Sequence, residues 1–277
     1  MVNPFRKFLA MLAAILLPGL ALGGCSDGSD RGGTIEPEAE QRPIVFVHGQ
    51  FGSAVQFETQ AMRFTSNGYP QELLFSFEYD TAVQTNPVTD FGAFIDDVLA
   101  ETGEDNVYVI AHSRGTSVTT AYLEDPDLGG ASKVARYVNV DGRSPESLPG
   151  GVPTIGIWGE WNTADSGFNR TEDGGNAQIG PDPENNYYFA DKSHTEVLSS
   201  PEAFEVMYEF LAGIPARTSD VTEITSGPVN VAGRALFFAE NVGYAGATLQ
   251  VWTVEAETGQ RSATTPVETV TLPESGD

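Results

Sequence analysis

The chain has 277 residues, of which 39 are acidic and 14 are basic, giving a formal net charge of −25. This length suits one α/β domain with a small appendage, because a single hydrophobic core stops growing at about 250 to 300 residues. The negative charge excludes nucleic acid as a partner, because phosphate backbones are bound by basic surfaces. Cys25 is the only cysteine, so no disulfide can form within the chain.

Residues 1–24 have the features of a lipoprotein signal peptide. Arg6 and Lys7 precede an apolar run over residues 8–22, which is shorter than the roughly 20 residues needed to span a bilayer. Cys25 follows Leu-Gly-Gly, which resembles the lipidation motif of bacterial lipoproteins. We therefore expect an exported cell-envelope protein with an N-terminal lipid anchor. The alternative is ordinary signal cleavage and secretion, which would leave Cys25 as a free thiol.

Three further segments follow the signal peptide. Residues 25–41 are small, polar and acidic, which is typical of a disordered tether. Residues 42–215 alternate predicted strands with predicted helices, and this alternation indicates a mostly parallel sheet with helices on both faces. We expect strands at 43–47, 73–79, 107–111, 135–140, 154–158 and 187–189, helices at 57–67, 90–99, 116–123 and 201–211, and a long loop at 160–186.

Residues 216–277 have a different sequence pattern. Apolar runs at 236–238, 248–254 and 267–272 are separated by Gly, Asn and Pro, which predicts a small all-β segment. At about 60 residues it is marginal as an independent domain. We expect it to pack on the preceding domain or to continue in a longer β structure.

Residues 111–115 read Ala-His-Ser-Arg-Gly and lie between a predicted buried strand and a predicted helix. This context is typical of the nucleophile elbow, in which a sharp turn projects a serine hydroxyl from the carboxyl end of the sheet. The alternative is that Ser113 only caps the helix. The elbow predicts an α/β-hydrolase fold with Ser113 as the nucleophile, followed by the small C-terminal all-β segment.

A serine hydroxyl needs a base to become a good nucleophile, and the base is oriented by a third group. The chain has three histidines. His48 follows the first strand, where we expect it to brace a loop, and His112 belongs to the elbow. His194 lies on the loop after the last predicted strand and is the candidate base, with an uninvolved surface histidine as the alternative.

The acid that orients the histidine normally lies between the serine and the histidine in the chain and at the end of a strand. Asp141 directly follows the predicted strand 135–140. Glu160 and Asp165 follow the next strand and compete for the role. Asp141 is favoured because it ends its strand directly.

The oxyanion of a tetrahedral intermediate is ordinarily stabilised by two backbone N–H groups. One belongs to the residue after the nucleophile and the other to the loop after the first strand. These positions hold Arg114 and Gln50. The reaction needs no cofactor, and the sequence contains no cluster with the spacing of metal ligands.

The segment 43–79 resembles the archaeal long-chain lipases of the Archaeoglobus type, with Val-His-Gly-Gln-Phe-Gly-Ser-Ala near its start, Asn-Gly-Tyr-Pro at 67–70 and Phe-Glu-Tyr-Asp at 77–80. The similarity extends through the elbow, Val-Asp-Gly at 140–142, His194 and residues 200–210. The resemblance implies a lipase or esterase with Ser113, Asp141 and His194 as the catalytic triad. It also implies that Gln50 and Arg114 hold the oxyanion positions.

Three features depart from these lipases. We expect the long lid insertion that follows the second strand of those lipases to be missing here. The β tail is shorter, and the oxyanion positions carry polar instead of apolar residues. We therefore expect a carboxylic ester hydrolase acting on small-molecule or lipid esters, without extending long-chain specificity to it. A polyester or other acyl hydrolase with an open groove is one alternative. A non-catalytic surface lipoprotein that uses the fold for binding is another.

Overall fold

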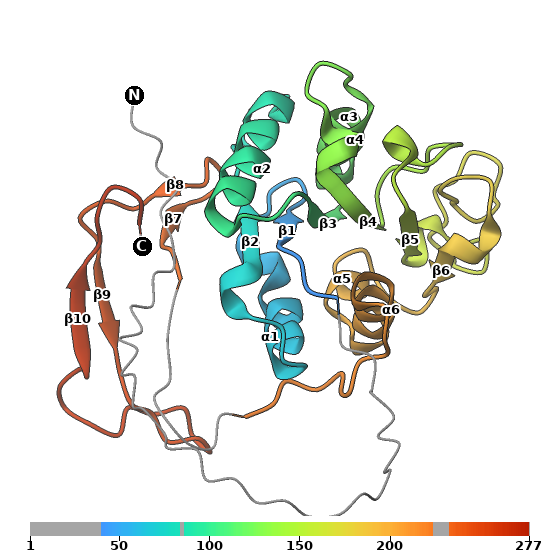
Figure 1. Ribbon diagram of the computed structural model, residues 1–277. Coiled ribbons are helices and arrows are strands. Elements are labelled where there is room, and N and C mark those ends of the chain that lie inside the picture. The colour runs from blue at the N-terminus through green and yellow to red at the C-terminus, as the bar shows by residue number, and fades with distance from the viewer. Residues whose placement is uncertain (1–39, 84–85, 224–232, 277) are drawn as a thin grey trace, which may run out of the picture.

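Six parallel strands form the central sheet of the computed structural model, which describes residues 40–83, 86–223 and 233–276 (Figure 1). The strands lie in the order β2-β1-β3-β4-β5-β6. Their bounds are β1 Ile44–Val47, β2 Leu74–Phe77, β3 Val107–His112, β4 Val134–Val140, β5 Thr154–Trp158 and β6 Asn186–Tyr188. Because all six are parallel, their carboxyl ends lie at one edge of the sheet.

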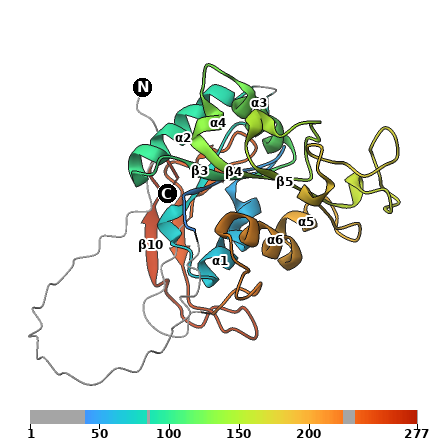
Figure 2. The ribbon, with the colours of Figure 1, turned by 45° about the vertical axis from the view of Figure 1, so that its right-hand side comes forward.

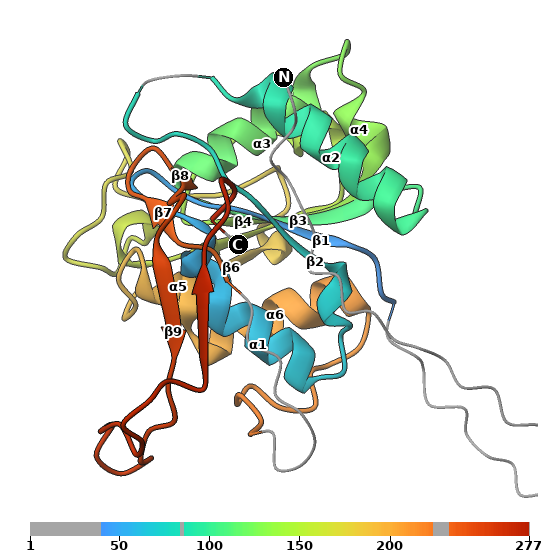
Figure 3. The same cartoon turned by 90° about the vertical axis from the view of Figure 1, so that its left-hand side faces the viewer.

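Helices cover both faces of this sheet. Their bounds are α1 Glu58–Ser66, α2 Val88–Thr102, α3 Arg114–Glu124, α4 Gly130–Lys133, α5 Glu196–Ser199 and α6 Pro201–Ala212, with short 3₁₀ turns at Ala54–Phe57, Gln71–Leu73, Pro149–Gly151, Glu160–Asn162 and Pro183–Asn185. Figure 3 shows α2, α3 and α4 on one side of the strands and α1, α5 and α6 on the other. The predicted α/β architecture is thus confirmed.

Alternation along the buried strands gives the core two large clusters, one on each face of the sheet. In β1, Val45 and Val47 pack in the cluster that includes the apolar residues of α2 and α3, whereas Ile44 and Phe46 pack in the cluster that includes α1 and α6. Successive side chains of a strand point to opposite faces, so a strand covered on both sides must be apolar throughout. This explains why continuous apolar runs marked the strands in the sequence.

The ends of the long helices follow local chemistry. Helix α6 has Pro201 at its first position, and the hydroxyl of Ser200 accepts a hydrogen bond from the backbone N–H of Ala203 at 3.2 Å. The same helix ends at Gly213, whose φ of 75° is left-handed. Helix α2 ends in the same way at Gly103, which has a φ of 74°.

The predicted elements of residues 42–215 appear with bounds shifted by a few residues. The predicted helix 90–99 extends in both directions to become α2, and the predicted helix 116–123 begins two residues earlier as α3. The short helices α4 and α5 were not predicted, because four residues are too few to show helical periodicity. The long loop 160–186 contains only short 3₁₀ turns between β5 and β6.

The C-terminal residues form two small antiparallel sheets, as expected from the sequence. One pairs β7 Leu236–Phe237 with β8 Val242–Gly243, and the other pairs β9 Thr248–Val251 with β10 Glu268–Thr271. Figure 2 shows β10 beside the main domain, and Figure 3 shows the sheet of β9 and β10 projecting away from β7 and β8.

Asn241, in the turn between β7 and β8, joins the C-terminal sheets to the main domain. Its buried amide donates hydrogen bonds to the carbonyl oxygens of Gly52 at 2.8 Å and Tyr79 at 3.2 Å. Nearby, the backbone N–H of Thr81 donates to the carbonyl oxygen of Ala239 at 3.0 Å. The C-terminal segment therefore packs on the loops that follow β1 and β2, at the carboxyl edge of the sheet.

The predicted signal peptide, Cys25 and nearly all of the predicted tether lie outside the described residues. Within the described residues, none of the helices combines the length and apolar character needed to cross a membrane. The same residues contain no group of three or more His, Cys, Asp or Glu side chains placed to bind a metal ion.

Candidate active site

Ser113 occupies a sharp turn between β3 and α3. Its backbone has φ 53° and ψ −120°, a conformation that is unfavourable for a residue with a side chain. The backbone N–H of Ser113 donates to the carbonyl oxygen of Val140 at the end of β4, at 3.0 Å. This conformation is therefore held in place by the neighbouring strand.

Two glycines allow the turn to form. A Cβ atom on Gly115 would overlap the carbonyl oxygen of Val47 and lie 2.7 Å from that of His48. A Cβ atom on Gly49 would lie 3.0 Å from the Cβ of Ser113. The end of β1, the turn and the start of α3 are thus packed too closely for any larger residue at Gly115.

His194 and Asp141 form a close pair across the carboxyl edge of the sheet. The Nδ1 atom of His194 lies 2.5 Å from Oδ2 of Asp141. The other carboxylate oxygen of Asp141 accepts hydrogen bonds from the backbone N–H of Gly159 and the side-chain amide of Asn162, both at 2.7 Å. Asp141 lies directly after β4, is buried and has a positive φ of 49°. The hydrogen bonds to its two carboxylate oxygens hold it in this position.

The protonation state of Asp141 follows from these contacts. Burial alone would raise the pKa of Asp141, because it removes water from the charged form. Hydrogen bonds from His194, Asn162 and the Gly159 N–H outweigh burial and lower the pKa below its usual value. Asp141 is therefore a carboxylate at neutral pH, and it fixes the proton of His194 on Nδ1.

The ring of His194 is held by two further aromatic side chains. Trp161 stacks on it, with ring centroids 4.4 Å apart and an interplanar angle of 11°. His112 lies on another side, with ring centroids 4.6 Å apart, and its Nε2–H donates to the carbonyl oxygen of His194 at 2.9 Å. Trp161 and Asn162 lie in the 3₁₀ turn that comes soon after β5, and no sequence pattern marks them.

The competing acids lie apart from this pair. Glu160 is bound through its backbone N–H to the carbonyl oxygen of Lys192 at 2.8 Å, and Asp165 is exposed. Among the described residues, neither lines the pocket that contains His194. The geometry thus brings Asp141 to the histidine and leaves Glu160 and Asp165 away from it.

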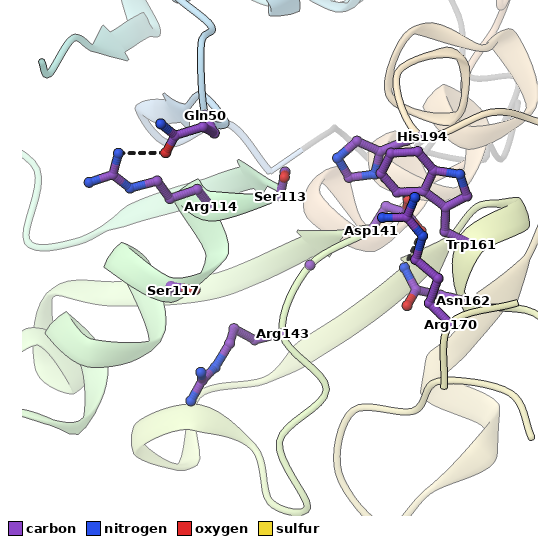
Figure 4. A pocket seen from close by; sticks show the side chains of 11 residues that line it. Gln50, Ser113, Arg114, Ser117, Asp141, Arg143, Trp161, Asn162, Arg170 and His194 are labelled. Carbon is purple, nitrogen blue, oxygen red and sulfur yellow. Dashed lines mark hydrogen bonds and ion pairs between the residues drawn. The ribbon is translucent and has the colours of Figure 1, made fainter. Parts of the chain in front are cut away.

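These residues open into one pocket of about 420 Å³ (Figure 4). The pocket is lined by Gln50, Ser113, Arg114, Ser117, Asp141, Gly142, Arg143, Trp161, Asn162, Arg170 and His194. Figure 4 shows the His194 ring facing the Ser113 hydroxyl. All five residues expected at the site from the sequence therefore line the same pocket.

Gln50 and Arg114 contact each other through their side chains. The guanidinium of Arg114 donates to Oε1 of Gln50 at 2.6 Å, and Nε2 of Gln50 donates to the carbonyl oxygen of Thr81 at 2.9 Å. Gln50 lies on the loop after β1, and Arg114 begins α3. Their backbones therefore flank Ser113 from two different elements.

His48 does not line the pocket. It is buried, its Nδ1 lies 3.0 Å from the carbonyl oxygen of Gly49, and its ring stacks on Tyr79 with centroids 4.3 Å apart. Asn241 approaches its Nε2 at 3.3 Å. These contacts fit the role expected from the sequence, which is to brace the loop that carries Gln50.

Two lipase families match parts of this chain. Residues 41–128 match the family described as lipase (class 2), and residues 227–277 match the family described as lipase C-terminal domain. The first match includes Ser113, and the second includes the β7–β10 region. Together they support a lipase/esterase family for this α/β-hydrolase.

Similar solved structures include a gene product of Listeria innocua, with 14% identity, a TM-score of 0.46 and coverage of 65% of this chain and 97% of that one. A lipase of Bacillus licheniformis has 14% identity, a TM-score of 0.45 and coverage of 64% and 95%. Lipase B of Aspergillus fumigatus has 14% identity and a TM-score of 0.48, and the match covers 67% of this chain and about half of the fungal chain, 55%.

The buried His112 makes stability depend on pH. Burial, and then the neighbouring His194, lower the pKa of His112 from 6.5 to about 4, so the folded protein keeps this ring neutral. The unfolded chain binds a proton below pH 6.5, and stability therefore falls as the pH drops from 6.5 toward 4. Between about pH 7 and pH 5 this group should lower the free energy of unfolding by about 2 kcal/mol.

The measurement is urea unfolding of the wild type and His112→Gln at both pH values. Glutamine keeps a hydrogen-bond donor but does not titrate, so the variant should lose less stability on acidification than the wild type. An equal loss in the two proteins would contradict this role of His112.

Proposed function

We propose that this protein is a serine carboxylic ester hydrolase that works through an acyl-enzyme on Ser113. The observation that carries the proposal is the shared pocket of Ser113 and His194, in which Asp141 holds the histidine at 2.5 Å. A serine on a strained turn, a histidine facing it and a buried carboxylate behind the histidine are the parts that acyl transfer requires.

The first half of the proposed reaction forms the acyl-enzyme. Nε2 of His194 takes the proton of the Ser113 hydroxyl as Oγ attacks the ester carbonyl carbon. The tetrahedral intermediate collapses, the bond to the alcohol oxygen breaks, and His194 gives the proton to that oxygen. Asp141 stabilises the charged histidine between these two proton transfers and keeps the ring oriented.

The second half regenerates the free serine. A water molecule loses a proton to His194 and attacks the acyl carbonyl carbon, and collapse of the second intermediate returns the proton to Oγ and releases a carboxylic acid. In both halves the negative oxygen would be stabilised by the backbone N–H groups of Gln50 and Arg114. The contact between their side chains supports this arrangement, because it ties the two backbones together beside Ser113.

The side chains that line the pocket help to choose between the possible functions of the protein. The lining is rich in polar and charged side chains, and Trp161 is the one large aromatic residue among the described residues that line the pocket. This lining offers little apolar surface to a long acyl chain, so we do not propose long-chain lipase specificity. A polyester or other acyl hydrolase remains the second proposal within the same chemistry. A non-catalytic binding protein would not need the close pairing of Asp141 with His194.

Substitution of the triad tests the proposal. Ser113→Ala and His194→Ala should each lower kcat for p-nitrophenyl butyrate by about 10⁴-fold or more, since the triad acts as a unit. Asp141→Asn should cost about 10⁴-fold, because the histidine loses its correct tautomer. Glu160→Gln and Asp165→Asn serve as matched controls and should stay within about twofold.

Circular dichroism of each variant checks that the fold is intact. Activity close to that of the wild type in Ser113→Ala or His194→Ala would overturn the proposed mechanism. A large loss in Glu160→Gln or Asp165→Asn, with Asp141→Asn unaffected, would move the acid to the loop after β5. A wild type without any hydrolysis would favour the non-catalytic binding protein.

We also propose that the protein is exported and anchored in a membrane through a lipid on Cys25. This rests on the Leu-Gly-Gly-Cys sequence after the apolar run of the signal peptide. Mass spectrometry of the N-terminal peptide from membrane-extracted protein should find acyl chains on Cys25, and Cys25→Ala should release the protein from membranes. An unmodified Cys25 in the mature protein would contradict the proposal.

A further inference from the structure

The pocket is positively charged, although the protein as a whole is strongly negative. Three of the chain's eleven arginines, Arg114, Arg143 and Arg170, line it, while the formal net charge is −25. Among the described residues that line the pocket, Asp141 is the one acidic side chain. Its two oxygens are already bound by His194, Gly159 and Asn162. The arginines therefore give this region a local charge opposite to that of the protein surface.

Several other arginines are used in the structure itself. Arg42 and Arg136 form ion pairs with Glu40, at 3.0 Å and 3.2 Å. Arg63 donates to two main-chain carbonyl oxygens, at 2.7 Å and 2.6 Å. In the described part of the chain, by contrast, no carboxylate forms an ion pair with Arg143 or Arg170. Their charges are available to a bound molecule.

Two of the pocket arginines are held by contacts with neighbouring side chains. Arg170 lies over the ring of Trp161, with its guanidinium carbon 3.8 Å from the ring centroid. Arg114 donates to Gln50 at 2.6 Å and lies 5.5 Å from the ring centroid of Tyr79. Stacking uses the face of a guanidinium and leaves N–H groups at its edge, where a carboxylate binds.

The arrangement around Ser113 separates the two sides of a bound ester. His194 gives its proton to the leaving oxygen, so the alcohol part of the ester lies toward His194, and Arg170 is on that side. Figure 4 shows Arg114 across Ser113 from His194, and Arg143 below Ser113 with its guanidinium directed away from the serine. The acyl part of the substrate therefore extends toward Arg114, and Arg143 lines the same pocket farther from the serine.

We propose that the acyl part of the substrate carries a second, free carboxylate that Arg114 and Arg143 bind. This inference rests on the proposed ester hydrolase function. The substrate class is a monoester of a dicarboxylic acid, and its hydrolysis releases the alcohol and the dicarboxylate. An uncharged ester gains nothing from the arginines. An anionic one would be repelled by the rest of the protein and attracted at this pocket.

The test compares esters matched in acyl carbon number. Monoethyl succinate, glutarate and adipate are each paired with the ethyl ester of the straight-chain monocarboxylic acid of the same length, and released ethanol is measured for both. The wild type should show a higher kcat/KM for the charged member of at least one pair. Without the arginines the neutral member should be preferred, because removing a carboxylate from water is unfavourable. Added salt should lower the charged-to-neutral ratio, because it screens partly exposed charges.

Substitutions show which arginine causes the preference for the charged ester. Arg143→Gln should lower the charged-to-neutral ratio about fivefold, the size of effect expected for one partly exposed ion pair, and Arg143→Lys should restore part of it. Arg217→Gln is the matched control, because Arg217 is also exposed but does not line the pocket, and its ratio should match that of the wild type. Arg170→Gln examines the alcohol side and should change the ratio less than Arg143→Gln.

The outcomes separate this inference from the proposed function. If the wild type hydrolyses p-nitrophenyl butyrate but prefers the neutral member of all three pairs, the carboxylate-binding proposal is wrong and the ester hydrolase stands. A ratio that falls in Arg170→Gln but not in Arg143→Gln would overturn the assignment to the acyl side. If p-nitrophenyl butyrate and all six ethyl esters are left intact, the proposed function fails and this inference fails with it.

Discussion

The close approach of β1 to the start of α3 is the constraint on which the candidate site depends. Because Gly115 has no side chain, the carbonyl oxygens of Val47 and His48 can lie against it. Ser113 is thereby forced into a turn with φ 53°, and the hydrogen bond from its N–H to Val140 holds it there. The unfavourable conformation is balanced by the packing of two buried strands, as is common where a protein must present a reactive group.

The parallel sheet brings the remaining groups to the same edge. Asp141 follows β4, Trp161 and Asn162 follow β5, and His194 follows β6, so side chains distant in sequence meet where the strands end. The C-terminal segment reaches this edge as well, because Asn241 binds the loops after β1 and β2. The lipase C-terminal domain match thus corresponds to a part of the chain that contacts the loop carrying Gln50. Site and C-terminal segment form one connected structure.

The sequence was sufficient to predict the sheet, because strands buried on both faces are continuous apolar runs. It also predicted the neighbourhood of Ser113, since the elbow has a local pattern, and His194, since few histidines compete for its role. It favoured Asp141 as the acid but kept Glu160 and Asp165 as competitors, because the difference lies in which carboxylate points at the histidine. Trp161, Arg170 and Asn241 act through contacts between distant segments, so no local pattern marks them. The sequence also did not predict that arginines line the pocket, because these arginines come from separate parts of the chain.

Covalent labelling of Ser113 tests the central claim most directly. The native protein would be treated with an alkyl fluorophosphonate, which forms a stable tetrahedral adduct only with a serine that a base activates, and its peptides would be analysed by mass spectrometry. The account predicts one adduct, on Ser113, and little or none in His194→Ala or in unfolded protein. An adduct on a different serine, or equal labelling of Ser113 in the native protein and in His194→Ala, would contradict it.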